Sequence, residues 1–571
     1  MKLIVQYIRR HLALFLLALF FLTVEATADL LQPTLMAGIV DNGVKGMDVG
    51  VILHYGVVML LVAAMGAVGA VMRNQFASRT SQTIGRELRS DLYRKVQSLS
   101  LENIDRLQPA SIITRITNDV TQIQEFTNSC MRIMAKAPIT CIGAVILLIV
   151  QTPRQIPIMV VILLIAAVLV TANMKLGYPR FGFMQKKLDW LNNISREFLS
   201  SIRVVKAFRA EAQEERKFSD ASQGLANATA SAMRIMAIFG PLINLAVNLG
   251  IVALLWLSQN RSSAEIGRLM ASVNYMTQIL FSLGMVSNIL NTAARAIASS
   301  DRVSEILQEQ PAQTLPAQPR TLDGRGEVEF EDVSFAYAGT GKDALSHVSF
   351  RAAPGQTIGI IGPTGAGKST LVQLVPRFYD AQSGVVRVDG VDVTQAQPAC
   401  LRAAVAIVPQ KALLFSGSIA ENLRWGQADA SMDDIRQAAR VACADSFIER
   451  TEHGYDTQLG QGGVNLSGGQ KQRLALARAL VRRPKVLILD DCTSALDAET
   501  EAKVLSGLRE QSADITVLLI SQRIAAVRRA DRILCLEDGT VQGFGTHDEL
   551  MASCPTYQAI YASQIGGDSN G

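Results

Sequence analysis

The chain has 571 residues, of which 49% are hydrophobic and only 18% are charged, and its net charge is +5. This length accommodates two or more domains, and so low a charged fraction excludes a wholly soluble protein. No basic stripe with interleaved aromatic residues follows the sequence, so nucleic acid is excluded as a partner, and the positive excess is best explained as charge beside a membrane. The seven cysteines include no C-x-x-C pair, which argues against a disulfide framework or a zinc site.

The N-terminal segment has two interpretations. Residues 1–10 are basic, residues 12–24 are apolar, and Ala26-Thr27-Ala28 is similar to a signal-peptidase site. However, the apolar segment continues past Gln32-Pro33 to about residue 39, which is long enough to span a bilayer. We therefore expect an uncleaved first membrane helix.

Apolar runs long enough to cross a bilayer recur along the first half of the chain. They predict six spans, at residues 12–38, 51–73, 133–152, 156–175, 235–258 and 265–292. The short connections, 41–50, 152–155 and 258–264, would lie outside. The long connections, 74–132 and 176–234, are charged and helical in pattern, and the first is rich in arginine. The positive-inside rule places the long connections and the N-terminus in the cytoplasm.

The second half of the chain has a different pattern, in which short apolar strands alternate with helical stretches. The predicted strands are 358–361, 405–408, 486–489, 517–520 and 533–536. A segment containing Pro311, Pro316 and Pro319 precedes them and marks a boundary. We therefore predict an α-helical membrane domain of six spans at 1–310, a linker at 311–325, and an α/β domain with a helical subdomain at 326–571. Six spans return the α/β domain to the cytoplasm.

A phosphate-binding motif lies between the first predicted strand of the α/β domain and a helix. Residues 362–369, Gly-Pro-Thr-Gly-Ala-Gly-Lys-Ser, fit the P-loop pattern G-x-x-x-x-G-K-[ST]. The glycines let backbone N–H groups surround the phosphates, Lys368 would reach the β- and γ-phosphates, and Ser369 would bind Mg²⁺. The residues expected to contact ATP in and after this loop are Gly362, Thr364, Gly365, Ala366, Gly367, Lys368, Ser369 and Thr370.

Leu466-Ser-Gly-Gly-Gln470 adds a second motif, and the combination resembles the ATP-binding cassette (ABC) transporters in their exporter arrangement. The resemblance covers essentially the whole chain. It implies that Tyr337 stacks on adenine and that Asp490, the acidic residue of the Walker B strand, holds Mg²⁺ through water. It also implies that Gln410 touches Mg²⁺ and reports to the membrane domain, and that Asp497 ends the D-loop beside the nucleotide.

The signature motif has a physical reason to act on a second chain. Ser467 and the amides of Gly468 and Gly469, followed by Gln470, open a predicted helix and make a second cradle for the γ-phosphate. One set of six spans and one cassette make half a transporter. The resemblance implies that two cassettes face head to tail and hold each ATP between one P-loop and the other signature. The turns near 101–109 and 202–209 are the expected contacts with an ATPase domain.

Three positions depart from the family pattern. Asp491 stands where the family's general base is Glu, and misplacing a carboxylate by about an ångström costs on the order of 10²-fold in rate. Gln522 stands where the family has a switch His, and an amide cannot carry the proton or charge of imidazole. Gln461 replaces an acidic residue typical of exporters, which weakens the expected contact with the partner's cytoplasmic helices.

Two losses in one site predict a chain that binds ATP better than it cleaves it. The chain resembles the subunit with the degenerate site in heterodimeric bacterial multidrug exporters. Asp491, Gln522 and Gln410 are its candidate catalytic residues, and the partner is expected to supply the Walker B Glu and the switch His that this chain lacks. The alternative is that Asp491 works as the base, which would favour an ordinary homodimer.

Polar side chains within the predicted spans are costly in a membrane and usually have a role. The candidates for a substrate cavity are Glu25, Asn244, Asn248, Asn274, Gln278, Phe281 and Met285. For the asparagines, hydrogen bonding between helices is the favoured explanation. Glu25, with Asp29 one turn along, is the candidate for recognising a cationic substrate.

These inferences predict a subunit of an ATP-driven exporter in the cell (inner) membrane, with ATP and Mg²⁺ at the cassette and lipid around the spans. Its expected substrates are small hydrophobic or amphipathic compounds, moved out of the cytoplasm or the inner leaflet. A lipid flippase is the nearest alternative, because drug and lipid need the same lateral access. From a different class, an ATP-gated channel or sensor subunit is compatible with a weakly hydrolytic site.

Overall fold

The computed structural model describes residues 1–151, 153, 156–257, 266–511 and 514–565. Two of the predicted outer connections, 152–155 and 258–264, lie outside the described residues apart from residue 153. The chain forms two units. The first consists of Met1–Gln97 and Ala110–Gln308, and the second of Ser98–Pro109 and Glu309–Gly571. A short piece of the first long connection therefore belongs to the second unit.

The first unit is helical throughout its described elements. Its long helices are α2 (Leu12–Gly38), α3 (Val49–Ser98), α7 (Lys136–Gln151), α8 (Ile156–Ser200), α10 (Glu211–Leu257) and α11 (Ile266–Gln308). Its shorter helices are α1 (Lys2–Arg10), α5 (Pro109–Thr114), α6 (Val120–Ser129) and α9 (Ile202–Phe208). Each predicted span coincides, within a few residues, with part of one long helix. At 1.5 Å per residue, the 50 residues of α3 far exceed a bilayer of about 30 Å.

Five stretches of described helix are long and apolar enough to cross a membrane. They are Leu12–Val44, Val49–Ser98, Pro109–Gln151, Val160–Ser200 and Glu211–Ala253. The span predicted at 265–292 lies in α11 and is not among them, since polar residues such as Asn274 and Gln278 interrupt its apolar run.

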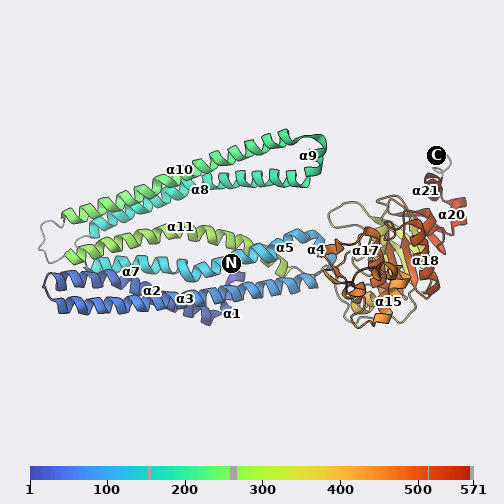
Figure 1. Ribbon diagram of the computed structural model, residues 1–571, viewed down its shortest axis with the longest axis horizontal. Helices are drawn as coiled ribbons and strands as arrows, with labels where there is room; N and C mark the ends of the chain where they lie inside the picture. The colour runs from blue at the N-terminus through green and yellow to red at the C-terminus, as the bar shows by residue number, and fades with distance from the viewer. Residues whose placement is uncertain (152, 154–155, 258–265, 512–513, 566–571) are drawn as a thin grey trace. The chain divides into compact units, whose positions relative to one another are not determined.

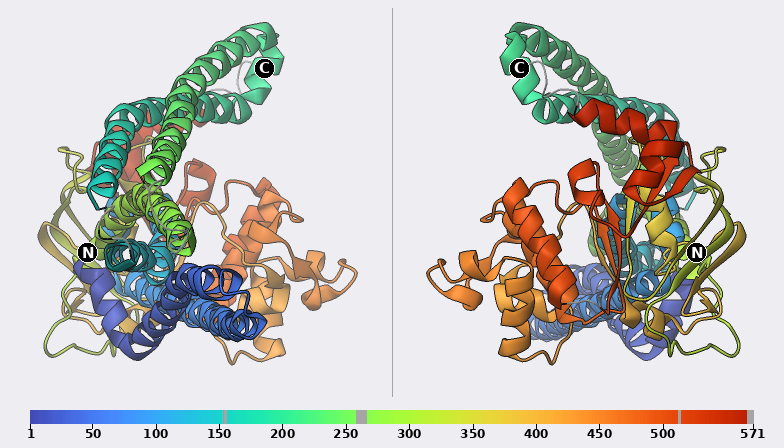
Figure 2. Two further views of the ribbon diagram at one scale, coloured as in Figure 1. Left: turned by 90° about the vertical axis from the view of Figure 1, so that its left-hand side faces the viewer. Right: turned by 90° about the vertical axis from the view of Figure 1, so that its right-hand side faces the viewer.

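Within the first unit, α2, α7 and α11 pack around a core that includes Leu30, Leu148 and Tyr275. Helix α3 approaches α2 closely at Gly69, where a Cβ would lie only 3.2 Å from the backbone nitrogen of Glu25. Helices α8 and α10 pair along their length (Figure 1). Their α9 end stands apart from the other helices of this unit in both views of Figure 2. The unit thus contains a core of three helices, which Ile162 of α8 also joins, and a helical pair whose α9 end lies apart from that core.

The second unit is built on two large sheets, and a third, two-stranded sheet pairs β7 (Gly417–Ser418) with β8 (Gln458–Leu459). The six-stranded sheet has the order β12 (Thr540–Gly545), β11 (Arg532–Glu537), β3 (Thr357–Ile361), β10 (Thr516–Ile520), β9 (Val486–Asp490) and β6 (Val405–Val408), with β12 antiparallel and the rest parallel. Every residue of β9 and β10 is buried, as a parallel sheet covered on both faces requires. The antiparallel sheet has the order β2 (Leu345–Ala352), β1 (Val328–Phe335), β4 (Ser383–Val388) and β5 (Val391–Asp392).

The remaining helices cover the sheets or form a helical subdomain. The covering helices include α12 (Lys368–Leu374), α13 (Pro398–Ala404), α18 (Ala498–Gln511), α19 (Ile524–Val527), α20 (His547–Ser553) and α21 (Pro555–Ile565). The subdomain contains α14 (Ile419–Arg424), α15 (Met432–Val441), α16 (Asp445–Ile448) and α17 (Gly468–Val481), which pack around Ile435 and Leu474. The α/β class and helical subdomain predicted from the sequence are confirmed.

Helix α4 (Leu101–Leu107) joins the second unit from a distant part of the chain. The Tyr379 hydroxyl donates to Asp105 Oδ2 at 2.5 Å. Asn103, only 3% exposed, donates to Glu309 Oε1 (2.6 Å) and to the carbonyl oxygen of Gln310 (2.9 Å), and its Oδ1 accepts from the N–H of Ala312 (2.9 Å). The predicted contact of residues 101–109 with the ATPase domain is therefore present.

Candidate nucleotide site

The P-loop follows β3, a buried strand of Thr357–Ile361, and leads into α12. Gly365 and Gly367 have φ values of +87° and +90°, a conformation that glycine adopts without strain. A Cβ on Gly367 would also lie 2.5 Å from the carbonyl oxygen of Ala344. Lys368 Nζ donates to the carbonyl oxygens of Gly362 and Pro363, both at 2.7 Å. The lysine thus lies across the loop that would hold phosphates.

A cavity of about 350 Å³ opens beside this loop. The predicted site residues that line it are Tyr337, Thr364, Gly365, Gly367, Lys368, Ser369, Thr370, Gln410, Asp490, Asp491 and Gln522. Ala344 and Ile520 also line it and were missed, because an alanine before a strand and an isoleucine within one carry no chemical signal. Gly362 contributes its carbonyl to Lys368, and Ala366 is buried in the core beneath the loop.

Parallel strands bring the acidic residues to the P-loop, because β9 is separated from β3 only by β10. Ser369 Oγ donates to Asp490 Oδ1 at 2.8 Å. Asp491, the next residue, has φ +46°, a left-handed conformation that Asp tolerates better than most residues. Its Oδ2 accepts hydrogen bonds from Gln410 Nε2 (3.1 Å) and from Gln522 Nε2 (3.2 Å). The three candidate catalytic residues therefore lie in direct contact.

Burial controls the charges of this cluster. Asp490 and Asp491 are each 7% exposed, and loss of hydration raises the pKa of both carboxyls. The hydrogen bond from Ser369 opposes the rise at Asp490, and the one from Gln410 opposes it at Asp491. Burial likewise lowers the pKa of Lys368, against the opposing effect of both carboxylates. Two acids and one cation in a partly dry pocket suit a ligand that brings both phosphate and a cation.

Tyr337 forms one wall of the cavity. Its hydroxyl is 3.2 Å from Thr370 Oγ1 and 3.4 Å from Gln373 Oε1. Its ring packs edge-on against Phe335 and Tyr379, with centroids 5.0 Å and 5.4 Å away. These contacts fix the ring at the rim of the cavity, where a flat base could stack on it.

The signature residues lie elsewhere on the cassette. Ser467 caps α17, since its Oγ accepts from the N–H of Gln470 and its own N–H donates to Gln470 Oε1. Ser467 and Gly468 are exposed, and neither they nor Gly469 and Gln470 line the cavity. The predicted helix start is confirmed, and it takes no part in this chain's own P-loop cavity.

The D-loop connects the signature helix to the acidic strand. Gln472 Oε1, on α17, accepts from the N–H of Ala495 at 3.1 Å. Asp497 caps α18 by accepting from the N–H and the hydroxyl of Thr500, each at 2.8 Å, and these bonds lower the pKa of its carboxyl. Asp497 is exposed and does not line the cavity.

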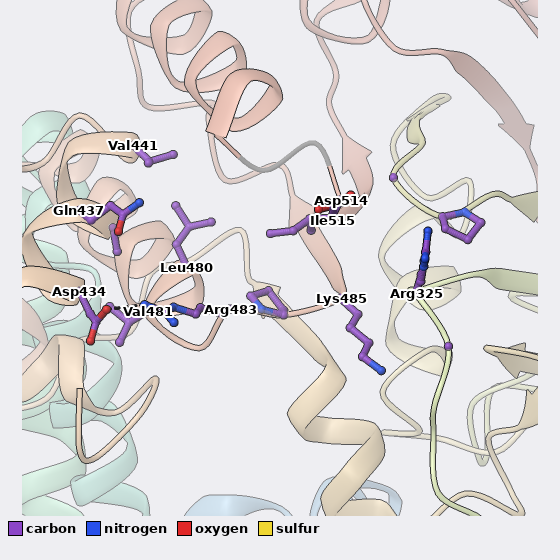
Figure 3. A pocket seen from close by; sticks show the side chains of 15 residues that line it. Arg325, Asp434, Gln437, Val441, Leu480, Val481, Arg483, Lys485, Asp514 and Ile515 are labelled. Atoms are coloured by element: carbon purple, nitrogen blue, oxygen red, sulfur yellow. Dashed lines mark hydrogen bonds and ion pairs between the residues drawn. The ribbon is translucent and has the colours of Figure 1, made fainter. Parts of the chain in front are cut away.

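A larger hollow of about 840 Å³ lies on another part of the cassette (Figure 3). It is lined by residues such as Arg325, Lys485 and Asp514, and Asp434 pairs there with Arg483. It contains none of the residues that the motifs single out. Size alone therefore does not identify the nucleotide site.

In the first unit, Glu25 belongs to a group of four charges. Arg73 Nε donates to Glu25 Oε2 and Lys136 Nζ to Glu25 Oε1, both at 2.6 Å, and Lys136 also lies 2.9 Å from Asp29 Oδ2. Glu25 is 7% exposed, whereas the Asp29 side chain is 46% exposed. A cationic substrate at Glu25 would have to displace one of two resident cations.

The other substrate candidates are dispersed. Gln278 Nε2 donates to the carbonyl oxygen of Asp29 at 3.3 Å, which links α11 to α2. Asn274 bonds to Met270 of its own helix at 3.1 Å. Phe281 and Met285 on α11, like Asn244 and Asn248 on α10, are exposed. An apolar hollow of about 600 Å³ between α8 and α10 is lined by none of these residues.

Comparisons with known proteins agree with this architecture. Residues 15–283 match the family model "ABC transporter transmembrane region", and residues 345–494 match the model "ABC transporter". The chain is 37% identical to the uncharacterized ABC transporter ATP-binding protein YfiB of Bacillus subtilis, covering 97% of each. It is 31% identical to an ATP-dependent lipid A-core flippase of Pseudomonas aeruginosa, covering 97% of this chain and 94% of the relative.

A solved structure, of a bacterial Atm1-family ABC exporter with ATP bound, superposes with a TM-score of 0.79 at 26% identity, over 98% of both chains. The two family models fall on the helical part and the cassette of one chain, in the order found in exporters. The chain therefore belongs to the ABC transporter family, as an exporter half-transporter that couples an ATPase cassette to transport across a membrane.

Proposed function

We propose that this chain is the ATP-holding subunit of a heterodimeric exporter. The observation that carries the proposal is the state of Asp491, whose Oδ2 accepts from the amides of both Gln410 and Gln522. This oxygen is held by two donors on a side chain one methylene shorter than the family's Glu, so the carboxylate is drawn back from the place where a base would meet the attacking water. An amide at position 522 orients a phosphate but moves no proton.

The exposed signature supports pairing with a second chain. Ser467 and Gly468 open α17 to solvent and take no part in the cavity around Lys368. In a head-to-tail pair they complete the partner's site, while the partner's signature covers ATP on Lys368. On α9, Val204 and Phe208 are 57% and 80% exposed, which suits a contact with the partner's cassette.

The chain's residues divide the work of binding. Tyr337 stacks on adenine. Lys368 exchanges its hydrogen bonds to the carbonyl oxygens of Gly362 and Pro363 for contacts with the phosphates. Ser369 Oγ and Asp490 Oδ1, 2.8 Å apart, offer the hard oxygen ligands that fit Mg²⁺, with Gln410 beside them. When bound, Mg²⁺ would offset phosphate charge. The raised pKa values of the buried carboxyls agree with cation binding, because a bound cation would stabilise their charged forms.

The membrane part is proposed to follow the six-span division at 1–310, with the linker at 311–325 and the cassette at 326–571. The basic N-terminus and the basic long connections favour an inner-membrane protein whose cassette lies in the cytoplasm. Hydrophobic or amphipathic compounds of the multidrug type remain the proposed substrates. Recognition of a cation by Glu25 is the finer hypothesis, and unchanged transport of cationic dyes by Glu25→Gln at equal protein level would contradict it.

A lipid flippase is the second candidate, favoured by the relative at 31% identity that bears this name. Labelled phospholipid in vesicles separates the two. ATP-dependent movement of the lipid between leaflets, without ATP-dependent movement of hydrophobic dyes, would favour the flippase.

The test of the ATP-holding role is the ATPase activity of the chain alone and of the chain co-purified with the product of a neighbouring gene, in lipid. We expect activity only from the pair, and its loss when Glu→Gln is introduced after the partner's Walker B strand. Brisk hydrolysis by this chain alone would contradict the proposal, because Asp491 would then be a working base.

A further inference from the structure

A glutamine on the last helix contacts the loop that carries Gln522. Helix α21 is anchored by Tyr557, which is fully buried among Ile524, Val527 and neighbouring residues. Near its end, Gln564 Nε2 donates to the carbonyl oxygen of Gln522 at 2.6 Å, and Gln564 Oε1 accepts from the N–H of Ile524 at 2.9 Å. One amide thus uses both of its ends to hold the backbone on either side of position 523.

The loop that Gln564 holds also makes two side-chain contacts, one with Asp491 in the nucleotide cavity and one beside the D-loop. The Gln522 side chain reaches Asp491 Oδ2 at 3.2 Å. The Arg523 guanidinium donates to the carbonyl oxygen of Leu496 at 3.2 Å and to Glu501 at 3.1 Å, beside the D-loop. A shift of the backbone between residues 520 and 524 would therefore move both the switch side chain and the support of the D-loop.

Gln522 lines the same cavity as Tyr337 and Lys368, the groups proposed to bind the base and phosphates, but it comes from a different segment of the chain. Tyr337 follows β1, and Lys368 belongs to the P-loop. The hydrogen bonds of these two side chains go to other residues than those of the segment 521–524. The D-loop in turn bonds to the signature helix through Gln472 and Ala495. A change at Gln564 should consequently affect what happens to bound ATP more than the binding of ATP.

We propose that Gln564 is a positioning residue for ATP turnover, which fixes the switch loop so that Gln522 and the D-loop keep their places. Only a side chain with a donor and an acceptor on one planar group can satisfy both backbone atoms. The inference holds whether the second subunit is another copy or a distinct chain, because Gln522 faces this chain's site and the D-loop adjoins the signature that serves the other.

The experiment measures kcat and KM for ATP with the intact transporter in lipid, for Gln564→Met and Gln564→Glu. Methionine keeps the length and loses both hydrogen bonds, whereas glutamate keeps an acceptor for Ile524 and places an oxygen against the Gln522 carbonyl. We expect kcat to fall about five- to tenfold in both variants, with KM for ATP unchanged within about twofold. Because Gln564 is exposed, both variants should fold and melt like the wild type.

The matched control is Gln558→Ala, an exposed glutamine of the same helix. Its amide donates only to the carbonyl oxygen of Met551, at 2.7 Å. We expect this variant to keep the wild-type kcat. An unchanged kcat in the Gln564 variants would overturn the inference. So would an equal loss in Gln558→Ala, or a joint fall of kcat and melting temperature, since either would show a merely structural role for α21.

Discussion

Asp491 combines an unusual backbone with an unusual side chain. Its φ of +46° lies in the left-handed region, and its Oδ2 is held by two amides. Lengthening the side chain by one methylene would bring the carboxylate toward the position that the family's Glu occupies. Under the proposed ATP-holding role, the difference between holding and cleaving ATP depends on a single carbon and on the residue at position 522.

We predict that Asp491→Glu together with Gln522→His raises hydrolysis at this chain's own site by on the order of 10²-fold. The measurement uses the complex carrying Ser467→Arg in this chain, which is expected to silence the partner's site and remove its background. Adding Asp490→Asn should abolish the gain, because the proposed Mg²⁺ ligand is then weakened. No gain from the double change would mean that the site lacks more than its base and its switch residue.

A second prediction concerns pH. Burial raises the pKa of Asp490 in the folded protein, so the folded state binds a proton more readily than the unfolded chain does. Stability without nucleotide should therefore be full at acid pH and fall as pH rises through that raised pKa. Asp490→Asn removes this penalty, and we expect a melting temperature about 2–4 °C higher at neutral pH, with the gain vanishing toward about pH 4.

Asp497→Asn is the control of opposite sign for this pH experiment. The pKa of Asp497 is lowered by its bonds to Thr500, so its contribution is present at neutral pH and lost as pH falls. A melting temperature lowered by Asp490→Asn at neutral pH would contradict the burial argument.

Among the elements, α4 gives a clear test of how the first long connection is joined to the cassette. Asn103, which is 3% exposed, bonds to Glu309, Gln310 and Ala312, and its replacement by alanine removes all three hydrogen bonds. We predict that Asn103→Ala costs about 2–4 kcal/mol locally and exposes the segment 309–315. Hydrogen exchange of the Ala312 amide is the measurement, and Glu102→Ala, on the exposed side of α4, should leave it unchanged.

The strands and long helices differ in how far the sequence determines them. The five parallel strands are buried on both faces, so their continuous apolar runs stand out, and each was predicted within a residue or two. The antiparallel strands β1, β2 and β4 were missed, because bulges and partial exposure break their pattern. Residues 101–109 were predicted to contact the cassette, but nothing local showed that residues 98–109 would be part of the cassette's own unit.

In the candidate site, too, the sequence predicts some features and not others. Motif residues from the P-loop to Gln522 converge on one cavity, because the parallel sheet brings the ends of β3, β9 and β10 together. Spacing alone could not show that Gln410 and Gln522 share one oxygen of Asp491. Nor could it reveal that Glu25 is matched by Arg73 and Lys136, which are 48 and 111 residues away.

For the whole molecule, an asymmetric pair predicts unequal effects of two changes in this one chain. In such a pair, Ser467→Arg should reduce the ATPase activity of the complex to background, because the signature would serve the catalytic site of the partner. Lys368→Ala should leave a substantial fraction, since it disables only the holding site. The measurement is steady-state hydrolysis of co-purified complexes. Equal losses from the two changes would indicate a symmetric homodimer.

The joining of α4 to the cassette has a consequence for how the protein is made. Asn103 leaves the ribosome 207 residues before Gln310, the backbone group it holds, and both flanks of its segment belong to helices of the first unit. The cassette cannot complete its surface until those helices have been inserted and the segment is presented at the right place. We therefore expect an order of folding, in which the membrane helices are inserted first and the ATPase cassette completes its folding afterwards.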